Sequence, residues 1–222
     1  MENKHQLINN IINNNNLSEG YILASQELIK IYGDKTTLFL QNGQFYEMFD
    51  KCIGDPKNKI FANQTILKEI CELCNGLVGI RGDSYLMWGP NIYSCERYIE
   101  LLLENGYNIV LTQQYDSGGN NLKRKITKVF SPGLPLITCN SKNDKLTNCN
   151  FMSISLNCSN ISDLICVGLS IVDVLNGNTF LNQLSDYNNN SITDLKDQLL
   201  HYISFYSPKE LLIICYNKNE NV

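Results

Sequence analysis

The stretch that decides the predicted fold is TTLFLQNGQFYEMFD, residues 36–50. Side chains alternate with a period of two on both sides of Asn42-Gly43, and both runs are rich in β-branched or aromatic residues, which is typical of β-strands. Asn-Gly between two such runs is the strongest short hairpin signal, because a type I′ turn requires positive φ at both central residues. We therefore predict a β-hairpin with Asn42 and Gly43 at its turn.

On the second strand of this hairpin, a ring and a carboxylate stand two residues apart. The period of two places Phe45, Glu47 and Phe49 on one face. Tyr46 and Met48 then lie on the other face. Two interpretations are open. Either Phe45 is a core residue and Glu47 a solvated or cross-strand partner, or the ring stacks on a base and the carboxylate accepts a hydrogen bond beside it.

Composition indicates a folded, soluble protein with little electrostatic attraction for nucleic acid. Of the 222 residues, 43% are hydrophobic and 18% charged, with a net charge of −4. Phosphate neutralisation supplies most non-specific affinity for nucleic acid, so DNA contacts must be local. The start is rich in asparagine, and we expect residues 1–16 to be disordered. Neither a signal peptide nor a long apolar run is present, which predicts an intracellular protein without membrane contact.

Helical and strand patterns follow one another along the rest of the chain, which predicts an α/β fold. The expected domains are a first domain at 17–133, a linker at 134–149 where periodicity is lost, and a second domain at 150–222. The second domain reads β-β-β-α-β and ends on a buried-type strand, so we expect it to be incomplete. The predicted helices span 17–32, 64–74, 93–104 and 192–206, and the further predicted strands span 107–111, 123–130, 151–158, 165–174, 179–184 and 211–215.

Two clusters of potentially functional side chains lie outside the hairpin. Cys71 and Cys74 form a lone CxxC among nine cysteines, and without a second pair at zinc-ribbon spacing we expect reduced structural thiols and no metal. The basic cluster falls on one predicted strand, so that some of its members could contact phosphate; a solvated edge strand explains the cluster equally well. Its members are Lys123, Arg124, Lys125 and Lys128. Alternation along the strand places Lys123 and Lys125 on one face and Arg124 and Lys128 on the other.

Several segments, in this order, resemble the N-terminal part of the MutS family of DNA mismatch recognition ATPases. GQFYEMF at 43–49 resembles the family's G-D-F-Y-E-L-F, and ERYIELLLENGYNIVLTQQ at 96–114 resembles its helix-Gly-strand segment. KRKITKVFSPGL at 123–134 is similar to the basic strand that closes the first domain. VGLSIVDVLNGNTF at 167–180 and SPKELLI at 207–213 resemble parts of the connector domain.

This resemblance implies a mixed-sheet α+β mismatch-binding domain followed by a partial RNase H-like connector domain. It also implies that Phe45 wedges into the minor groove at a mispaired or unpaired base and that Glu47 hydrogen-bonds the base. Gln44, Tyr46 and the basic cluster join them as expected DNA-binding residues. The implied partners are duplex DNA with a mismatch or small loop, the remaining MutS domains and a family-type dimer partner.

The chain also departs from the family pattern. Gln44 replaces an acidic residue, the Gly-x-Pro-x-His corner reads Gly89-Pro90-Asn91-Ile92-Tyr93, and Gln113 replaces a glutamate. No GxxxxGK[ST] motif occurs, so we expect no ATPase activity in this chain and no cofactor, with ATP and Mg²⁺ belonging to the family's ATPase region. A second functional hypothesis is a protein-interaction or scaffold part of a MutS homologue with vestigial DNA binding.

Overall fold

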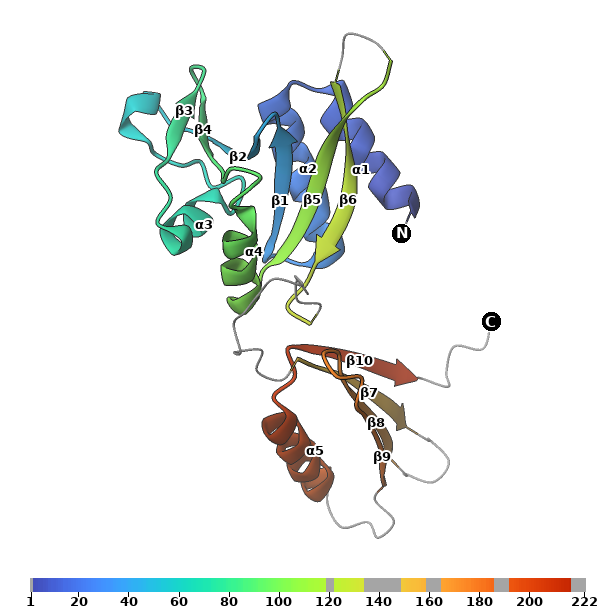
Figure 1. Ribbon diagram of the computed structural model, residues 1–222. Helices are drawn as coiled ribbons and strands as arrows, with labels where there is room; N and C mark the ends of the chain where they lie inside the picture. Colours follow the sequence, from blue (N-terminus) through green and yellow to red (C-terminus); the bar gives the residue numbers. More distant parts are fainter. Residues whose placement is uncertain (1, 119–121, 134–148, 159–164, 186–191, 217–222) are drawn as a thin grey trace. The chain divides into compact units, whose positions relative to one another are not determined.

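The chain divides into two compact units, residues 1–136 and 137–222, and each is described by itself. A computed structural model describes residues 2–118, 122–133, 149–158, 165–185 and 192–216 (Figure 1). The predicted linker at 134–149 lies, apart from Cys149, outside the described residues. Among the helices described, none combines the length and the apolar character needed to cross a membrane.

The first unit is a mixed six-stranded sheet with helices on both faces, which confirms the predicted α/β class. The elements are α1 (Glu2–Asn14), α2 (Leu17–Tyr32), β1 (Thr36–Asn42), β2 (Phe45–Lys51), a 3-10 turn (Pro56–Asn58), α3 (Leu67–Cys74), β3 (Gly79–Arg81), β4 (Tyr85–Trp88), α4 (Cys95–Glu104), β5 (Asn108–Asp116) and β6 (Leu122–Phe130). Strand β1 runs parallel to β5, and the other neighbouring pairs are antiparallel, in the order β3-β4-β2-β1-β5-β6. Figure 1 shows α1 and α2 behind the sheet and α4 in front of it.

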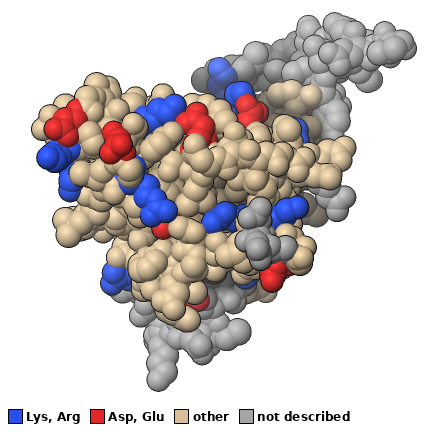
Figure 2. All heavy atoms as spheres, turned by 90° about the horizontal axis from the view of Figure 1, so that it is seen from above, with Lys and Arg blue, Asp and Glu red and all other residues tan. Residues whose placement is uncertain are grey.

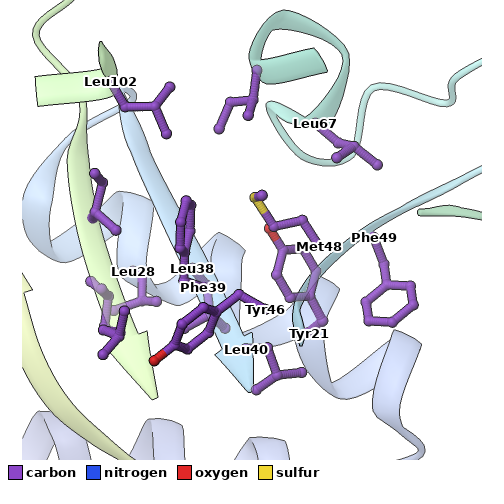
Figure 3. Packing of buried hydrophobic residues seen from close by; sticks show 14 of the residues in the cluster. Tyr21, Leu28, Leu38, Phe39, Leu40, Tyr46, Met48, Phe49, Leu67 and Leu102 are labelled. Atoms are coloured by element: carbon purple, nitrogen blue, oxygen red, sulfur yellow. The ribbon is translucent and has the colours of Figure 1, made fainter. Parts of the chain in front are cut away.

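The core of this unit lies on both sides of β1 and β2. Tyr21 of α2 meets Phe49 of β2 edge to face, with ring centroids 5.6 Å apart (Figure 3). Phe39 of β1 packs against Tyr46 of β2 at 5.8 Å. Each such buried side chain contributes roughly 1.5 to 3 kcal/mol to folding. From its second residue to Asp50, β2 is buried on both faces, so the hairpin is held firmly in the centre of the domain.

The prediction that residues 1–16 are disordered is wrong, because residues 2–14 form helix α1. Ile8 and Ile12, four residues apart and so on one face of the helix, are 0% and 2% exposed in the core of the unit. The apolar contacts of these isoleucines stabilise a helix whose many asparagines have poor intrinsic helix propensity.

Two asparagines of α1 satisfy the free edge of strand β6. Asn9 Oδ1 accepts a hydrogen bond from Ile126 N at 2.8 Å. Asn13 uses both ends of its amide, with Oδ1 accepting from Arg124 N and Nδ2 donating to Arg124 O, each at 2.8 Å. Edge strands carry unpaired backbone groups that invite aggregation, and a covering helix is one way of protecting them. The Asn-rich start therefore protects the free edge of the sheet.

The second unit has the predicted β-β-β-α-β order. Strands β7 (Asn150–Cys158), β8 (Ile165–Asp173) and β9 (Thr179–Ser185) form an antiparallel meander, and helix α5 (Ile192–Tyr206) precedes β10 (Glu210–Tyr216). Strand β10 joins the sheet parallel to β7, in the order β10-β7-β8-β9. The buried side chains of this core include Met152, Val167 and Leu195. The assignment of this unit to the RNase H-like class stays a prediction.

Candidate nucleic-acid interface

The hairpin forms as predicted, but its turn lies one residue further along the chain. Asn42 is the last residue of β1 and pairs with Phe45, so Gly43 and Gln44 are the two turn residues. Gly43 has a φ of 61°, whereas Gln44 is not among the residues of positive φ. Positive φ at the first central residue alone is the pattern of a type II′ turn, in which glycine is preferred there. The predicted type I′ turn is therefore wrong.

Phe45 is the first residue of β2 and its side chain is 48% exposed, whereas the five residues after it are buried. Its backbone is fixed on the outer side by the segment before α4. Tyr46 N donates to Pro90 O, Ile92 N donates to Gln44 O, both at 2.9 Å, and Phe45 forms an isolated bridge with Asn91. The ring is thus presented to solvent from a rigid backbone.

Gly89 allows this close approach, a role that the sequence did not reveal beyond the corner motif. A Cβ added at Gly89 would lie 1.6 Å from Tyr46 O and 2.7 Å from Tyr46 C. Contacts of that kind are impossible without movement of backbone. Only glycine therefore lets the segment before α4 lie against the start of β2.

The turn itself is anchored from strand β5. Gly43 N donates to Gln114 Oε1 at 2.7 Å, and Gln114 N donates to Gln41 Oε1 at 2.8 Å. Gln41 Nε2 closes the arrangement by donating to Gly43 O at 3.2 Å. These bonds join β1, β5 and the turn, so the turn beside the exposed ring is fixed to the centre of the sheet.

Glu47 lies two residues beyond Phe45 and is 7% exposed. Its Oε2 accepts a hydrogen bond from Asn42 Nδ2 at 3.0 Å. Asn42 Oδ1 in turn accepts from Arg124 Nη2 at 3.1 Å. The predicted ring and carboxylate therefore come from one strand as expected, but the carboxylate is held by residues whose role the sequence did not reveal.

Two further expected DNA contacts have different outcomes. Tyr46 is 6% exposed and packs on Phe39, so its burial disfavours a DNA contact, which stays a prediction. The reason is that β2 is buried on both faces from Tyr46 onward. Gln44 is exposed in the turn beside Phe45, where a DNA contact stays a prediction.

A β-bulge rearranges the basic cluster on β6. Lys123 pairs with Tyr115 and Lys125 with Gln113, but the register shifts so that Lys128 pairs with Leu111. Since cross-strand partners share a face, the three lysines lie on the same face of the sheet, and all are exposed. Plain alternation had placed Lys128 on the opposite face, which is wrong because Thr127 is the extra residue of the bulge.

Arg124 does not belong with these lysines. Its side chain is half-buried, and Nε donates to Gln41 O at 2.7 Å while Nη2 donates to Asn42. Two of its five N–H groups are thus used within the hairpin. A phosphate contact of Arg124 stays a prediction, and its bonds to β1 set it apart from the exposed lysines.

Charge is scattered on the face of the molecule seen in Figure 2. Lys and Arg side chains are separated there by uncharged surface, and Asp and Glu lie between them. The face in this view offers no continuous basic patch. This agrees with the net charge of −4 and favours short-range contacts over long-range attraction for DNA.

Comparison with known proteins places this hairpin in a named family. Residues 27–136, which contain the whole of β1, β2, β5 and β6, match the sequence family MutS domain I. Through this domain the chain belongs to the MutS family. The matched residues include Phe45, Glu47, Arg124 and the three exposed lysines of β6.

Individual MutS relatives agree with this assignment. A mutS homologue of Acanthamoeba polyphaga mimivirus, named as a DNA mismatch repair protein, is 25% identical over 208 residues. That match covers 90% of this chain and 18% of the relative. The DNA mismatch repair protein MutS of Halothermothrix orenii is 26% identical over 183 residues, 79% of this chain and 17% of its own length. MutS of Shouchella clausii is 33% identical over 102 residues, 43% of this chain and 10% of its own length. The chain thus spans less than a fifth of each of these relatives.

The departures from the MutS pattern lie beside the exposed ring. Gln44 and Tyr93 stand where the resemblance has an acidic residue and a histidine, and both are exposed. Tyr93 is 83% exposed at the end of the segment that Gly89 brings against β2. Gln114, which matches the family, anchors the turn. The two departures from the motif thus lie on the exposed side of Phe45, whereas Gln114 lies in the support of the turn.

The CxxC pair of MutS domain I in this chain lies on α3 and faces the core. Cys71 is 6% and Cys74 is 9% exposed. Burial raises the pKa of Cys71 to about 12 and that of Cys74 to about 11. Reactive cysteines have lowered pKa values, so the burial and the raised pKa of both thiols favour a structural role in the core.

Proposed function

We propose that this chain binds duplex DNA at mispaired or unpaired bases and acts in MutS-type mismatch repair. The observation that carries the proposal is the side chain of Phe45, 48% exposed at the head of a strand that is otherwise buried. This half-exposed ring is not among the residues of the hydrophobic core. The ring is suited to insert between two base pairs, because hydrogen bonds hold the hairpin that carries it in place.

A ring inserted in this way distinguishes mismatched from matched DNA by how easily the base pairs unstack. Inserting a ring between base pairs costs a few kcal/mol of stacking and kinks the DNA. The cost is lower where a mismatch has already weakened stacking, and the ring recovers about 1 to 3 kcal/mol per base with little regard to base identity. One phenylalanine can therefore recognise many mispairs.

Glu47 supplies the second part of the proposed mechanism. Among the described residues its carboxylate has one hydrogen-bond partner, Asn42. A carboxylate has about four lone-pair positions, so it retains capacity to accept from a base N–H group. A base that meets the carboxylate without offering a donor is disfavoured, because the negative charge would lie near it unpaired. Glu47 in this way restricts which displaced bases are accepted.

The lysines of β6 supply the expected backbone contacts. Lys123, Lys125 and Lys128 form one exposed row on a face of the sheet. Such contacts set register and orientation but read no sequence. Because the row is short and the net charge is −4, we expect weak binding at low salt that the other MutS domains strengthen by acting together. Those domains, together with a dimer partner, are the proposed protein partners.

A second candidate function is protein interaction through the second unit, and strand β10 favours it. Leu211, Leu212 and Ile213 of β10 are 42%, 46% and 55% exposed, although their sequence is that of a buried strand. An apolar edge strand of this kind is suited to pair with another polypeptide. This function would leave DNA binding to the remainder of a MutS assembly.

The test is binding of the 222-residue chain, at low salt, to a duplex with one unpaired base and to its fully paired twin. We expect Phe45→Ala to reduce the preference for the unpaired base by about 5- to 150-fold, the equivalent of about 1 to 3 kcal/mol of stacking. The matched control is Phe205→Ala, which removes a ring that is 72% exposed on α5. Equal binding of wild type to both duplexes would contradict the proposal and favour the protein-interaction function.

A further inference from the structure

A chain of three residues connects strand β6 with the carboxylate of Glu47. Arg124 Nη2 donates to Asn42 Oδ1 at 3.1 Å, and Asn42 Nδ2 donates to Glu47 Oε2 at 3.0 Å. Arg124 Nε also donates to the main chain of β1, at Gln41 O and 2.7 Å. The guanidinium therefore holds both the backbone and the side chain at the end of β1, next to the turn that presents Phe45.

Strand register explains why these residues meet. Glu47 pairs directly with Leu40, so Asn42, two residues further along β1, is its diagonal neighbour on the same face. Arg124 pairs with Gln114 on β5, which lies between β6 and β1. Its side chain must cross β5, a distance of about 10 Å for two strand spacings. Arginine has the length for this and a fork that can donate to two acceptors at once.

Electrostatics strengthens the connection. Burial lowers the pKa of Arg124 from its usual value, and the negative charge of Glu47 acts in the opposite direction. An arginine stays protonated in proteins, so a fixed positive charge lies near the carboxylate in a partly dry environment. Arg124 and Glu47 are thus oriented both by the hydrogen bonds through Asn42 and by the attraction between their opposite charges.

The position of Arg124 is itself fixed from outside the region that matches MutS domain I. Asn13 of α1 bonds to both the N–H and the carbonyl of Arg124, each at 2.8 Å. Helix α1 lies before residue 27, where the family match begins. The arrangement therefore extends from α1 through β6 and β1 to the carboxylate on β2.

We propose that Arg124 and Asn42 are positioning residues that hold the Glu47 carboxylate in one orientation beside Phe45, and that Arg124 does not contact DNA phosphate. The inference rests on the proposed function, since Glu47 acts there on the displaced base. It adds two specificity-determining residues to that mechanism. It also separates Arg124 from its neighbours on β6, whose exposed lysines are the phosphate contacts.

Salt dependence of binding distinguishes positioning from phosphate contact. Arg124→Met and Asn42→Leu should each lower the preference for the unpaired-base duplex by about tenfold, while the slope of log affinity against log salt stays at its wild-type value. Arg124→Lys, which restores charge but not the fork, should not rescue the preference. The matched control, Lys125→Met, should weaken binding to both duplexes equally and reduce the slope by about 0.9. A reduced slope for Arg124→Met, or full rescue by lysine, would overturn the inference.

A measurement without DNA separates this inference from the proposed function. In ¹⁵N spectra of the free 222-residue protein, Arg124 Nε–H should exchange at least tenfold more slowly than the Nε–H of Arg81, which is exposed. Glu47→Gln should shift the Asn42 side-chain amide resonances. If Arg124 exchanges as fast as Arg81, positioning is refuted whatever the DNA result. If Arg124 is protected but wild type shows no mismatch preference, the bonds exist and the proposed function fails; the inference about specificity fails with it.

Discussion

Gly89→Ala is expected to lower the free energy of unfolding by about 3 kcal/mol or more and to abolish any mismatch preference. The added Cβ would lie 1.6 Å from Tyr46 O, so the backbone at the start of β2 or before α4 must move. That movement breaks the bonds from Tyr46 N to Pro90 O and from Ile92 N to Gln44 O. Phe45 then loses the support of its outer side. Chemical denaturation and duplex binding measure the two effects.

The matched control is Gly79→Ala, on strand β3 of the same unit. There the added Cβ would meet Met87 Cγ at 3.6 Å, which is an ordinary van der Waals contact. We expect a change in unfolding free energy within about 1 kcal/mol. If Gly89→Ala were as stable as Gly79→Ala and kept the same preference, the close approach behind Phe45 would not matter for either property.

Ile8→Ala is expected to lower the free energy of unfolding by about 2 to 5 kcal/mol, because it removes a fully buried side chain and leaves a cavity. Ile8 is 0% exposed, and it lies on α1 near the asparagines that cover the edge of β6. An effect of this size would show that the Asn-rich start is an integral part of the domain. Urea denaturation followed by circular dichroism is the measurement.

Leu7→Ala is the control on the neighbouring residue of the same helix. Leu7 is 54% exposed, so its loss should change the unfolding free energy by no more than about 0.5 kcal/mol. Equal and small effects of the two substitutions would mean that α1 does not pack on the sheet. That outcome would contradict the role of α1 as an integral part of the domain.

Much of the fold was predictable because its elements carry regular patterns. Helix α2 and helix α5 have the predicted bounds, and the strands of the second unit lie within two residues of theirs. Helix α1 was not predicted because asparagine dominates its composition, and asparagine usually marks loops or disorder. A signal was available in the spacing of four between Ile8 and Ile12, which is a helical period.

The candidate site was predictable in part. Phe45 and Glu47 were predicted from one strand and a motif, and both lie within residues 27–136, the range that matches MutS domain I. The bulge at Thr127, by contrast, leaves no trace in local sequence, yet it decides on which face Lys128 lies. The burial of Tyr46 depends on packing against Phe39, and the contact between Arg124 and Asn42 joins residues 82 apart in sequence. Such long-range pairs are fixed by strand order, which periodicity does not reveal.

The central claim is that the Phe45 ring enters the duplex, and DNA bending tests it most directly. A short duplex with one unpaired base carries a donor dye at one end and an acceptor at the other, and energy transfer is measured at saturating protein. A wedging ring kinks the duplex by roughly 20 to 90° and brings the ends closer. We predict higher transfer with wild type than in the free duplex, and no increase with bound Phe45→Ala. Equal transfer for the two bound proteins would contradict the claim.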